Sequence, residues 1–141
     1  MPIKNYTTKV DQNRTVSEVQ ALLAAKGARS IRVDYDEKGL PAALAFMVKW
    51  REQEVPFRLP VNWEGVAATL KRDRRKVDDA RARDVAWRIV KDWCAAQMAI
   101  IESGQASLAE VFLPYAMVGP QTTLFESMQT DPSRLLGDGK S

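Results

Sequence analysis

The sequence predicts a single α+β domain in which a small antiparallel sheet, drawn mainly from the first half of the chain, is followed by helices packed on one face. Two patterns predict it. Large apolar residues stand at every second position through residues 31–35, 43–50 and 55–59, which is the period of a half-buried strand. Apolar residues recur at helical spacing through residues 82–102. A chain of 141 residues that is 45% hydrophobic is long enough to bury one core.

The N-terminal segment predicts one strand and one helix. Residues 3–10 are rich in β-formers, so we expect a short first strand there. Thr15 and Glu18 have the spacing of a capping box, in which each side chain satisfies a free backbone donor of the other residue. Gly27 stands where a helix often ends. The first helix is therefore expected over residues 15–26.

The three alternating segments predict a meander of antiparallel strands. A turn rich in Asp, Gly and Pro follows residues 31–35, and the charged turn REQE follows residues 43–50. Pro56 and Pro60 bracket the strand over residues 55–59, and proline cannot donate to a hydrogen-bonded ladder. This strand is therefore expected at an edge of the sheet. The predicted order of elements is β-α-β-β-β, followed by helices.

The second half of the chain predicts helices. Asn62 is expected to cap a short helix after the last strand. The main helix is expected over residues 82–102, with Ile89 and Trp93 on its buried face. Pro114 interrupts the apolar helical stretch that follows. One more helical turn is expected near residues 121–129.

The chain shows no internal repeat and no linker. We therefore expect residues 1–130 to form one domain and residues 131–141 to form a flexible C-terminal tail. The polar N-terminus lacks the apolar stretch of a signal peptide, and no segment approaches the length of a membrane span. We expect a cytoplasmic protein without a membrane partner.

The residue types that most often perform catalysis are missing. The chain has no histidine, which is the commonest general base and metal ligand. Its single cysteine, Cys94, lies in the most apolar helix, where an inert buried thiol is expected. Asp34 and Asp36 are spaced to share one strand face and would be the first suspects for a metal site, yet aspartate is also common beside turns. We expect neither catalytic activity nor a cofactor or metal.

Charge is distributed unevenly along the chain. Residues 1–91 contain 19 Lys or Arg and 12 Asp or Glu, a net charge of +7, whereas residues 92–141 contain 2 and 6, a net charge of −4. This asymmetry indicates a basic face, which favours a polyanionic partner. The alternative is that the mixed charge only keeps a small domain in solution.

The run KRDRRK at residues 71–76 is the main candidate for phosphate contacts, which need several cations within reach of a regularly charged backbone. Cations of the main helix, including Arg83 and Lys91, extend the positive surface. The residues predicted to bind nucleic acid are Lys71, Arg72, Arg74, Arg75, Lys76, Arg81 and Arg88. The strand residues that would join them, if the exposed face of the sheet is basic, are Arg32, Lys49, Arg51 and Arg58.

Four aromatic side chains are candidates to stack on unpaired bases. They are Tyr35, Trp50, Phe57 and Trp63. The alternative is that these rings pack in the core while the basic residues form a solvated face. The stretch VFLPYAMVGP has the same two interpretations, because it can form core or an apolar surface for a partner.

Three stretches carry a resemblance: NYTTKV with RTVSEVQALLAAKGA near the start, VPFRLP in the middle, and AWRIVKDWCAAQMAIIESGQASLAEVFLPYAM toward the end. Together they resemble a family of small proteins from bacteriophages, prophages and mobile elements, over residues 4–118. The resemblance implies a phage-type setting and no particular chemistry. Small proteins without catalytic motifs in that setting usually handle DNA or inhibit host proteins.

The leading hypothesis is therefore a non-enzymatic nucleic-acid-binding protein, with a preference for single strands or an accessory role in phage replication or recombination. The alternative is a phage-encoded anti-defence inhibitor that binds a host protein complex. An enzyme with a carboxylate-bound metal comes third. The sequence leaves the oligomeric state open.

Overall fold

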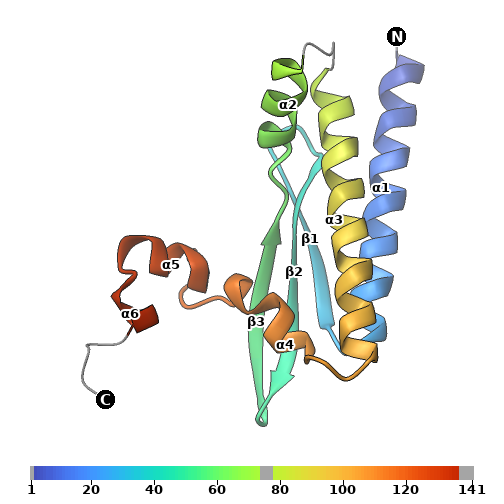
Figure 1. Ribbon diagram of the computed structural model, residues 1–141. Helices are drawn as coiled ribbons and strands as arrows, with labels where there is room; N and C mark the ends of the chain where they lie inside the picture. The colour runs from blue at the N-terminus through green and yellow to red at the C-terminus, as the bar shows by residue number, and fades with distance from the viewer. Residues whose placement is uncertain (1, 74–77, 137–141) are drawn as a thin grey trace.

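The computed structural model describes residues 2–73 and 78–136, with side chains described for residues 11–73, 78–133 and 135. Its elements confirm the predicted α+β class (Figure 1). They are α1 (Pro2–Ala25), β1 (Arg29–Tyr35), β2 (Pro41–Trp50), β3 (Gln53–Pro60), α2 (Trp63–Arg72), α3 (Asp79–Glu102), α4 (Leu108–Phe112), the 3₁₀ turn η1 (Leu113–Tyr115), α5 (Leu124–Thr130) and α6 (Ser133–Leu136).

The predicted first strand is wrong, because residues 3–10 belong to helix α1. The predicted capping box is wrong for the same reason: Thr15 lies inside this helix, and its buried hydroxyl donates to the carbonyl of Asp11 at 3.1 Å. β-propensity is a weak preference that tertiary packing overrides. Here α1 packs against α3, and the side-chain amide of the fully buried Gln12 donates to the carbonyl of Ala80 in α3 at 3.3 Å.

The three-stranded antiparallel sheet has the order β1-β2-β3, as the alternation predicted. The turn between β2 and β3 places Arg51 and Glu52 at positive φ, the geometry of a tight two-residue hairpin. The β3 strand lies at an edge, as its prolines predicted. Residues after η1 cover part of that edge, because the amide of Met117 donates to the carbonyl of Pro56 at 2.8 Å.

Helices α1 and α3 run side by side in the same direction and cover one face of the sheet (Figure 1). Two ion pairs tie them, Lys91 to Glu18 and Lys26 to Glu102. The buried core between the layers comes mainly from five elements: Val19 and Leu23 of α1, Leu44, Phe46 and Val48 of β2, Phe57 and Leu59 of β3, Ala86, Trp87, Cys94 and Met98 of α3, and Leu108 and Phe112 of α4.

The buried face of α3 differs from the prediction. It centres on Trp87, Cys94 and Met98, whereas Ile89 is 55% exposed and Trp93 is only half-buried. Because α3 is apolar over a broad arc, its neighbours decide which part of the arc faces the core. Trp87 is fixed further by its indole N–H, which donates to the carbonyl of Pro41 at 3.2 Å.

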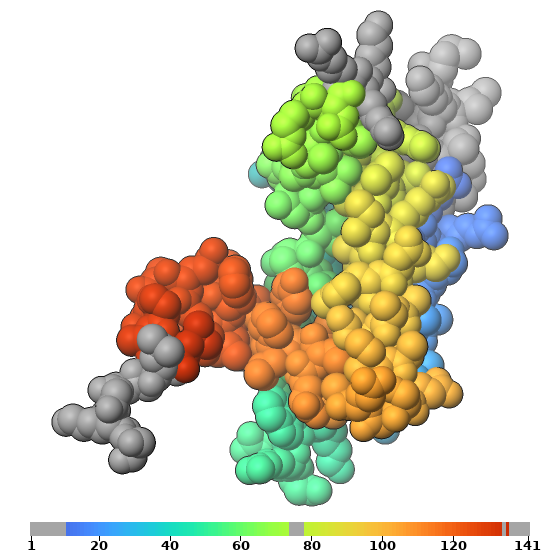
Figure 2. Space-filling model, viewed as in Figure 1, coloured from blue at the N-terminus to red at the C-terminus, as the bar shows by residue number. Residues whose placement is uncertain are grey.

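The C-terminal part leaves the body of the molecule. Helix α4 ends at Phe112, and Pro114 lies in the 3₁₀ turn η1 that follows, so the predicted interruption is confirmed. Helices α5 and α6 form an arm that projects from the body (Figures 1 and 2). The predicted tail over residues 131–141 contains α6, and residues 137–141 lie outside the described part of the chain. No helix within residues 2–73 and 78–136 has the length and apolar character needed to cross a membrane.

Candidate nucleic-acid interface

The face of the sheet opposite α1 and α3 carries a row of three residues, one on each strand. Arg32 of β1 pairs in register with Ala45 of β2, and Ala45 pairs with Arg58 of β3. Directly opposed residues in antiparallel strands project to the same side. Because Ala45 is small, the sheet has a hollow between two arginines.

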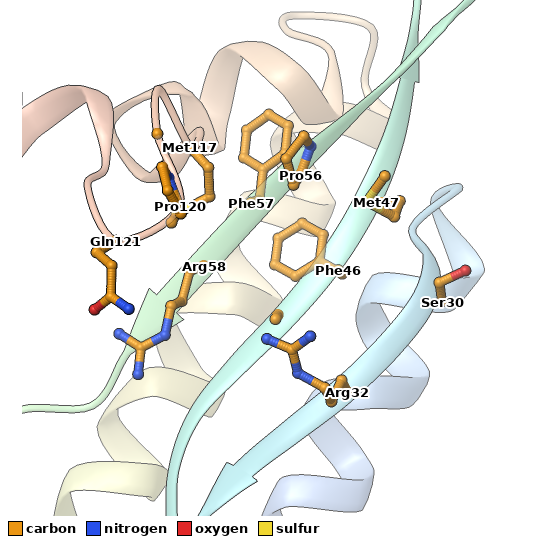
Figure 3. A pocket seen from close by; sticks show the side chains of 12 residues that line it. Ser30, Arg32, Phe46, Met47, Pro56, Phe57, Arg58, Met117, Pro120 and Gln121 are labelled. Carbon is orange, nitrogen blue, oxygen red and sulfur yellow. The ribbon is translucent and has the colours of Figure 1, made fainter.

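This hollow is a groove of about 640 Å³, which we call the sheet groove (Figure 3). Its walls come from all three strands and from the segment that follows η1. The lining residues are Ser30, Arg32, Ala45, Phe46, Met47, Pro56, Phe57, Arg58, Met117, Gly119, Pro120 and Gln121. The rings of Phe46 and Phe57 belong to the core, where they stack at 5.6 Å.

One carboxylate holds both arginines of the groove. The Nε of Arg32 donates to Asp34 Oδ1 at 2.8 Å, and the Nε of Arg58 donates to Asp34 Oδ2 at 3.3 Å. The bond from Arg32 lowers the pKa of Asp34 most, partial burial of the carboxylate opposes this, and Arg58 lowers the pKa further. Asp34 is therefore an anion at neutral pH. The trio keeps a net charge of +1, and its guanidiniums are anchored beside the groove.

An irregularity in β1 shapes the other side of the groove. Ser30 has a φ of +52°, and the register shifts between Arg29 and Arg32, so β1 contains a bulge with one extra residue opposite β2. A non-glycine residue in this conformation is strained by about 1 kcal/mol or more, and such residues gather at functional sites. Ser30 lines the groove at this point.

Three of the four strand cations of the conditional prediction, Arg32, Lys49 and Arg58, lie on the exposed face of the sheet. Lys49 and Glu54 form another opposed pair on this face. Carboxylates from outside the strands also act on these cations, since Glu52 of the hairpin turn lies 3.9 Å from Lys49 and Glu126 of α5 interacts with Arg58. Arg51 lies apart from this face, in the hairpin turn between β2 and β3.

The predicted basic run is only partly described. Lys71 and Arg72 are exposed in the last turn of α2, and Arg74, Arg75 and Lys76 lie outside the described residues. Arg81 and Arg88 are exposed on α3. Both approach one buried carboxylate, Asp84, at 3.9 and 3.3 Å.

These residues form a second basic surface where α2 and α3 meet, which we call the hairpin end after the helical hairpin of α2 and α3. Carboxylates offset its positive charge. Its described cations are Lys71, Arg72, Arg81 and Arg88, and the carboxylates interleaved with them are Asp73, Asp78, Asp79 and Asp84. The two sets are equal in number, so the described part of the hairpin end is neutral overall. The sheet face differs in that one carboxylate orients two of its arginines beside a groove, which makes this face the stronger candidate for holding an anion.

Arg83 was expected to extend the positive surface, and that expectation is wrong. Its side chain is 5% exposed, and it forms an ion pair with Asp36. The guanidinium also lies over the ring of Trp63. A buried cation of this kind joins α3 to α2 and to the turn after β1, which is a structural role.

The two aspartates suspected of binding metal do not form one site. The β1 strand ends at Tyr35, and its register is irregular between Asp34 and Tyr35. Asp34 consequently faces the two arginines of the groove, whereas Asp36 accepts from Arg83 and from the amides of the β1–β2 turn. Among the described residues, no group of three or more His, Cys, Asp or Glu side chains is arranged to hold a metal ion.

The four aromatic candidates are not brought together into a stacking surface. Phe57 is buried in the core, and Trp63 is half-buried against Arg83. Tyr35 and Trp50 are exposed, but they lie at opposite ends of the sheet. Phe57 and Trp63 therefore pack within the protein, which was the alternative to stacking on bases.

Cys94 is a buried structural thiol, as expected. It is fully buried in α3, and burial raises the pKa of its thiol to about 12. The thiol is therefore protonated at neutral pH, which leaves it without nucleophilic character.

The arm presents a different surface. A hollow of about 370 Å³ lies between η1 and the two helices of the arm, with a wall that is almost wholly apolar. Its lining residues are Leu113, Pro114, Leu124, Phe125, Met128, Gln129 and Leu135. Phe125 is 55% exposed and Leu135 is 70% exposed. Large apolar side chains so exposed are typical of a surface that binds another macromolecule.

The sequence analysis missed Ser30, Met117 and Gln121 as groove residues. Ser30 carries no signal, because its strained conformation follows from the bulge. Gly119 and Pro120 mark a turn in the sequence, but nothing there places this turn beside β3. Comparison with known proteins adds no further guide, since no family model, curated protein or solved structure matches this chain.

Proposed function

We propose that this protein is a non-enzymatic nucleic-acid-binding protein that contacts the phosphate backbone across the exposed face of its sheet. The observation that supports it is the pair Arg32 and Arg58, held by the single carboxylate of Asp34 at the edge of the sheet groove. Phosphate oxygens accept strong hydrogen bonds from guanidinium groups. The bound carboxylate positions the two cations and leaves other N–H donors of each guanidinium for a ligand.

The hairpin end extends the interface in this proposal. Its exposed cations supply further phosphate contacts, and Arg74, Arg75 and Lys76 add to them. Such contacts position a protein on nucleic acid without reading the base sequence. We place the protein in the cytoplasm, without a cofactor, as an accessory of phage replication or recombination. The resemblance in sequence to phage proteins supports this setting.

The test compares two double variants that remove the same charge. Arg32→Ala with Arg58→Ala alters the sheet face, and Lys71→Ala with Arg72→Ala alters the hairpin end. Binding to fluorescent oligonucleotides is measured by anisotropy between about 50 and 200 mM salt, where phosphate contacts weaken steeply. We expect the sheet variant to lose more affinity and to show a shallower dependence on salt, because fewer counterions are released.

Two results would change the proposal. A parent protein that binds no oligonucleotide at about 50 mM salt contradicts nucleic-acid binding altogether. A larger loss in the Lys71 and Arg72 variant keeps the function but moves the main contact to the hairpin end.

The apolar hollow of the arm favours a second function, an inhibitor that docks onto a host defence complex. Exposed aromatic and aliphatic side chains around a hollow are frequent anchors of protein interfaces. The matching test is Phe125→Ser. Under this hypothesis the variant loses a partner that the parent captures from host lysate, whereas the Arg32 and Arg58 variant keeps it.

A further inference from the structure

We infer that the sheet groove holds one unpaired nucleotide of a single strand, with its phosphate at Arg32 and Arg58 and its base against the opposite wall. This inference deepens the proposed function and rests on it. The groove has two chemically different ends, and a nucleotide has the same division between an anionic phosphate and a flat, largely apolar base.

The cationic end, which would take the phosphate, is defined by the two arginines (Figure 3). The carboxylate of Asp34 accepts a hydrogen bond from the Nε of each arginine. It also accepts one from a terminal nitrogen of Arg32, at 3.5 Å. Within the described residues, no protein acceptor is bound by the terminal nitrogens of Arg58. A phosphate at this end would therefore meet donors that are already oriented, without displacing the carboxylate that orients them.

The opposite end is apolar. Met47, Pro56 and Met117 lie away from the guanidiniums, and Pro120 lies beside Met117 (Figure 3). Thioether and proline surfaces make favourable contact with a flat ring and impose no base identity. Ser30 lies on the same side of the groove as Met47, where its hydroxyl can exchange hydrogen bonds with a base edge, and Gln121 lies beside Arg58, where its amide is near the phosphate end (Figure 3).

The dimensions of the groove favour one nucleotide. Its volume of about 640 Å³ lies within the range of small-ligand sites. The depth comes from Ala45, the small central residue of the row between the arginines. A base enters such a hollow only when it is neither paired nor stacked, because both faces and its edge are occupied in a duplex. The groove therefore selects single strands, whereas phosphate contacts alone do not.

The test fills the groove without altering its charge. Ala45→Leu places a larger apolar side chain on the floor of the groove, and Ala95→Leu makes the same change at an exposed site on α3. The probes are a fluorescent oligothymidylate of about 12 nucleotides and its duplex with oligoadenylate, within the site sizes of single-strand binders. Thermal melting of both variants confirms that they fold.

We expect the parent and Ala95→Leu to prefer the single strand by about tenfold or more, the ratio that 1.4 kcal/mol of base contact produces. Ala45→Leu should bind both probes with similar, salt-dependent affinity. A further variant, Arg32→Lys with Arg58→Lys, keeps the charge but lacks the planar fork, so it should lose single-strand affinity while duplex affinity changes less.

Equal affinity of the parent for the two probes overturns this inference and leaves the proposed function standing. A preference for the single strand that persists in the Ala45→Leu variant also overturns this inference and leaves the proposed function standing. No binding to either probe at about 50 mM salt overturns both. If free thymidine monophosphate displaces the single strand at a concentration no higher than that of unlabelled oligothymidylate, the ligand of the groove is a free nucleotide and the assignment is overturned. If a polyglutamate peptide does so, the ligand is an acidic protein segment and the assignment is likewise overturned.

Discussion

The guanidinium carbon of Arg83 lies 4.3 Å from the centre of the Trp63 ring, so the side chain of Arg83 joins α3 to the first residue of α2. The same guanidinium donates to Asp36 in the turn after β1. Asp36 in turn accepts from the amides of Lys38 and Leu40 at 2.9 and 3.0 Å. One buried cation therefore connects both helices of the hairpin end to the sheet.

Arg83→Met should lower the free energy of unfolding by about 3 kcal/mol, the low end for breaking a buried ion pair, because Asp36 is partly exposed and regains water. Methionine keeps most of the side-chain volume, so the change isolates the charge. The control is Arg81→Met, whose parent side chain is 62% exposed and should shift stability by no more than about 0.5 kcal/mol. Urea unfolding measures both, and equal losses would contradict the structural role of Arg83.

The core should depend more on Trp87 than on Trp93. Trp87 is 1% exposed and hydrogen-bonded, so Trp87→Ala should cost about 3–5 kcal/mol. Trp93 is half-buried, with its ring edge-on to Phe112 at 5.2 Å and to Tyr115 at 6.0 Å, and Trp93→Ala should cost clearly less. Chemical denaturation ranks the two variants. The reverse order would show that the core lies on the other side of α3.

Cys94 should resist a thiol-specific reagent such as DTNB until the chain unfolds. With a pKa of about 12, roughly one thiol in 10,000 is ionised at pH 8 in the folded protein. Because folding raises this pKa from its ordinary value of 9.0, the folded state keeps a proton that the unfolded state releases, and stability should fall as pH rises from 9.0 toward about 12. Rapid labelling without urea would contradict burial of the thiol.

Asp34 should make the free energy of unfolding depend on pH in the acid range, because the two groove arginines lower its pKa. Folding lowers its pKa, chiefly through the bond from Arg32, so its contribution is present above the ordinary value of 3.8 and is lost as pH falls through the lowered folded value. Other carboxylates add to the acid loss of the parent. The Arg32→Ala, Arg58→Ala variant should therefore show a shallower loss of stability below pH 3.8 than the Lys71→Ala, Arg72→Ala variant, which should behave like the parent. Identical pH profiles for the two variants would contradict the bridging role of Asp34.

Local patterns were reliable where a segment buries one face and carries its own boundary signals. The strands over residues 31–35, 43–50 and 55–59 follow from large apolar residues at every second position, which turns one set of side chains toward the core. Asn62 caps α2 as expected, by accepting from the amide of Gly65 at 2.9 Å. Pro114 also acts as predicted. Each of these outcomes depends on residues that are close in sequence.

Predictions failed where a distant partner decides the outcome. Residues 3–10 have β-formers but continue a helix, and Thr15 lies within that helix instead of capping it. Arg83 carries the same charge as Arg81, and only the position of Trp63 and Asp36 makes one buried and the other exposed. A charged residue's role depends on its neighbours in space, which periodicity along the chain does not contain.

The sequence by itself therefore determined the α+β class, the meander with its edge strand, the inert cysteine and an excess of positive charge. The tertiary structure alone decided where that charge concentrates. Strand register places Arg32 and Arg58 on either side of Ala45, 13 residues away from each of them along the chain, and the segment at Gly119–Gln121 completes the groove. The physical reason is that a site built across strands depends on register and on the packing of distant segments, and these long-range contacts form only when the whole core assembles.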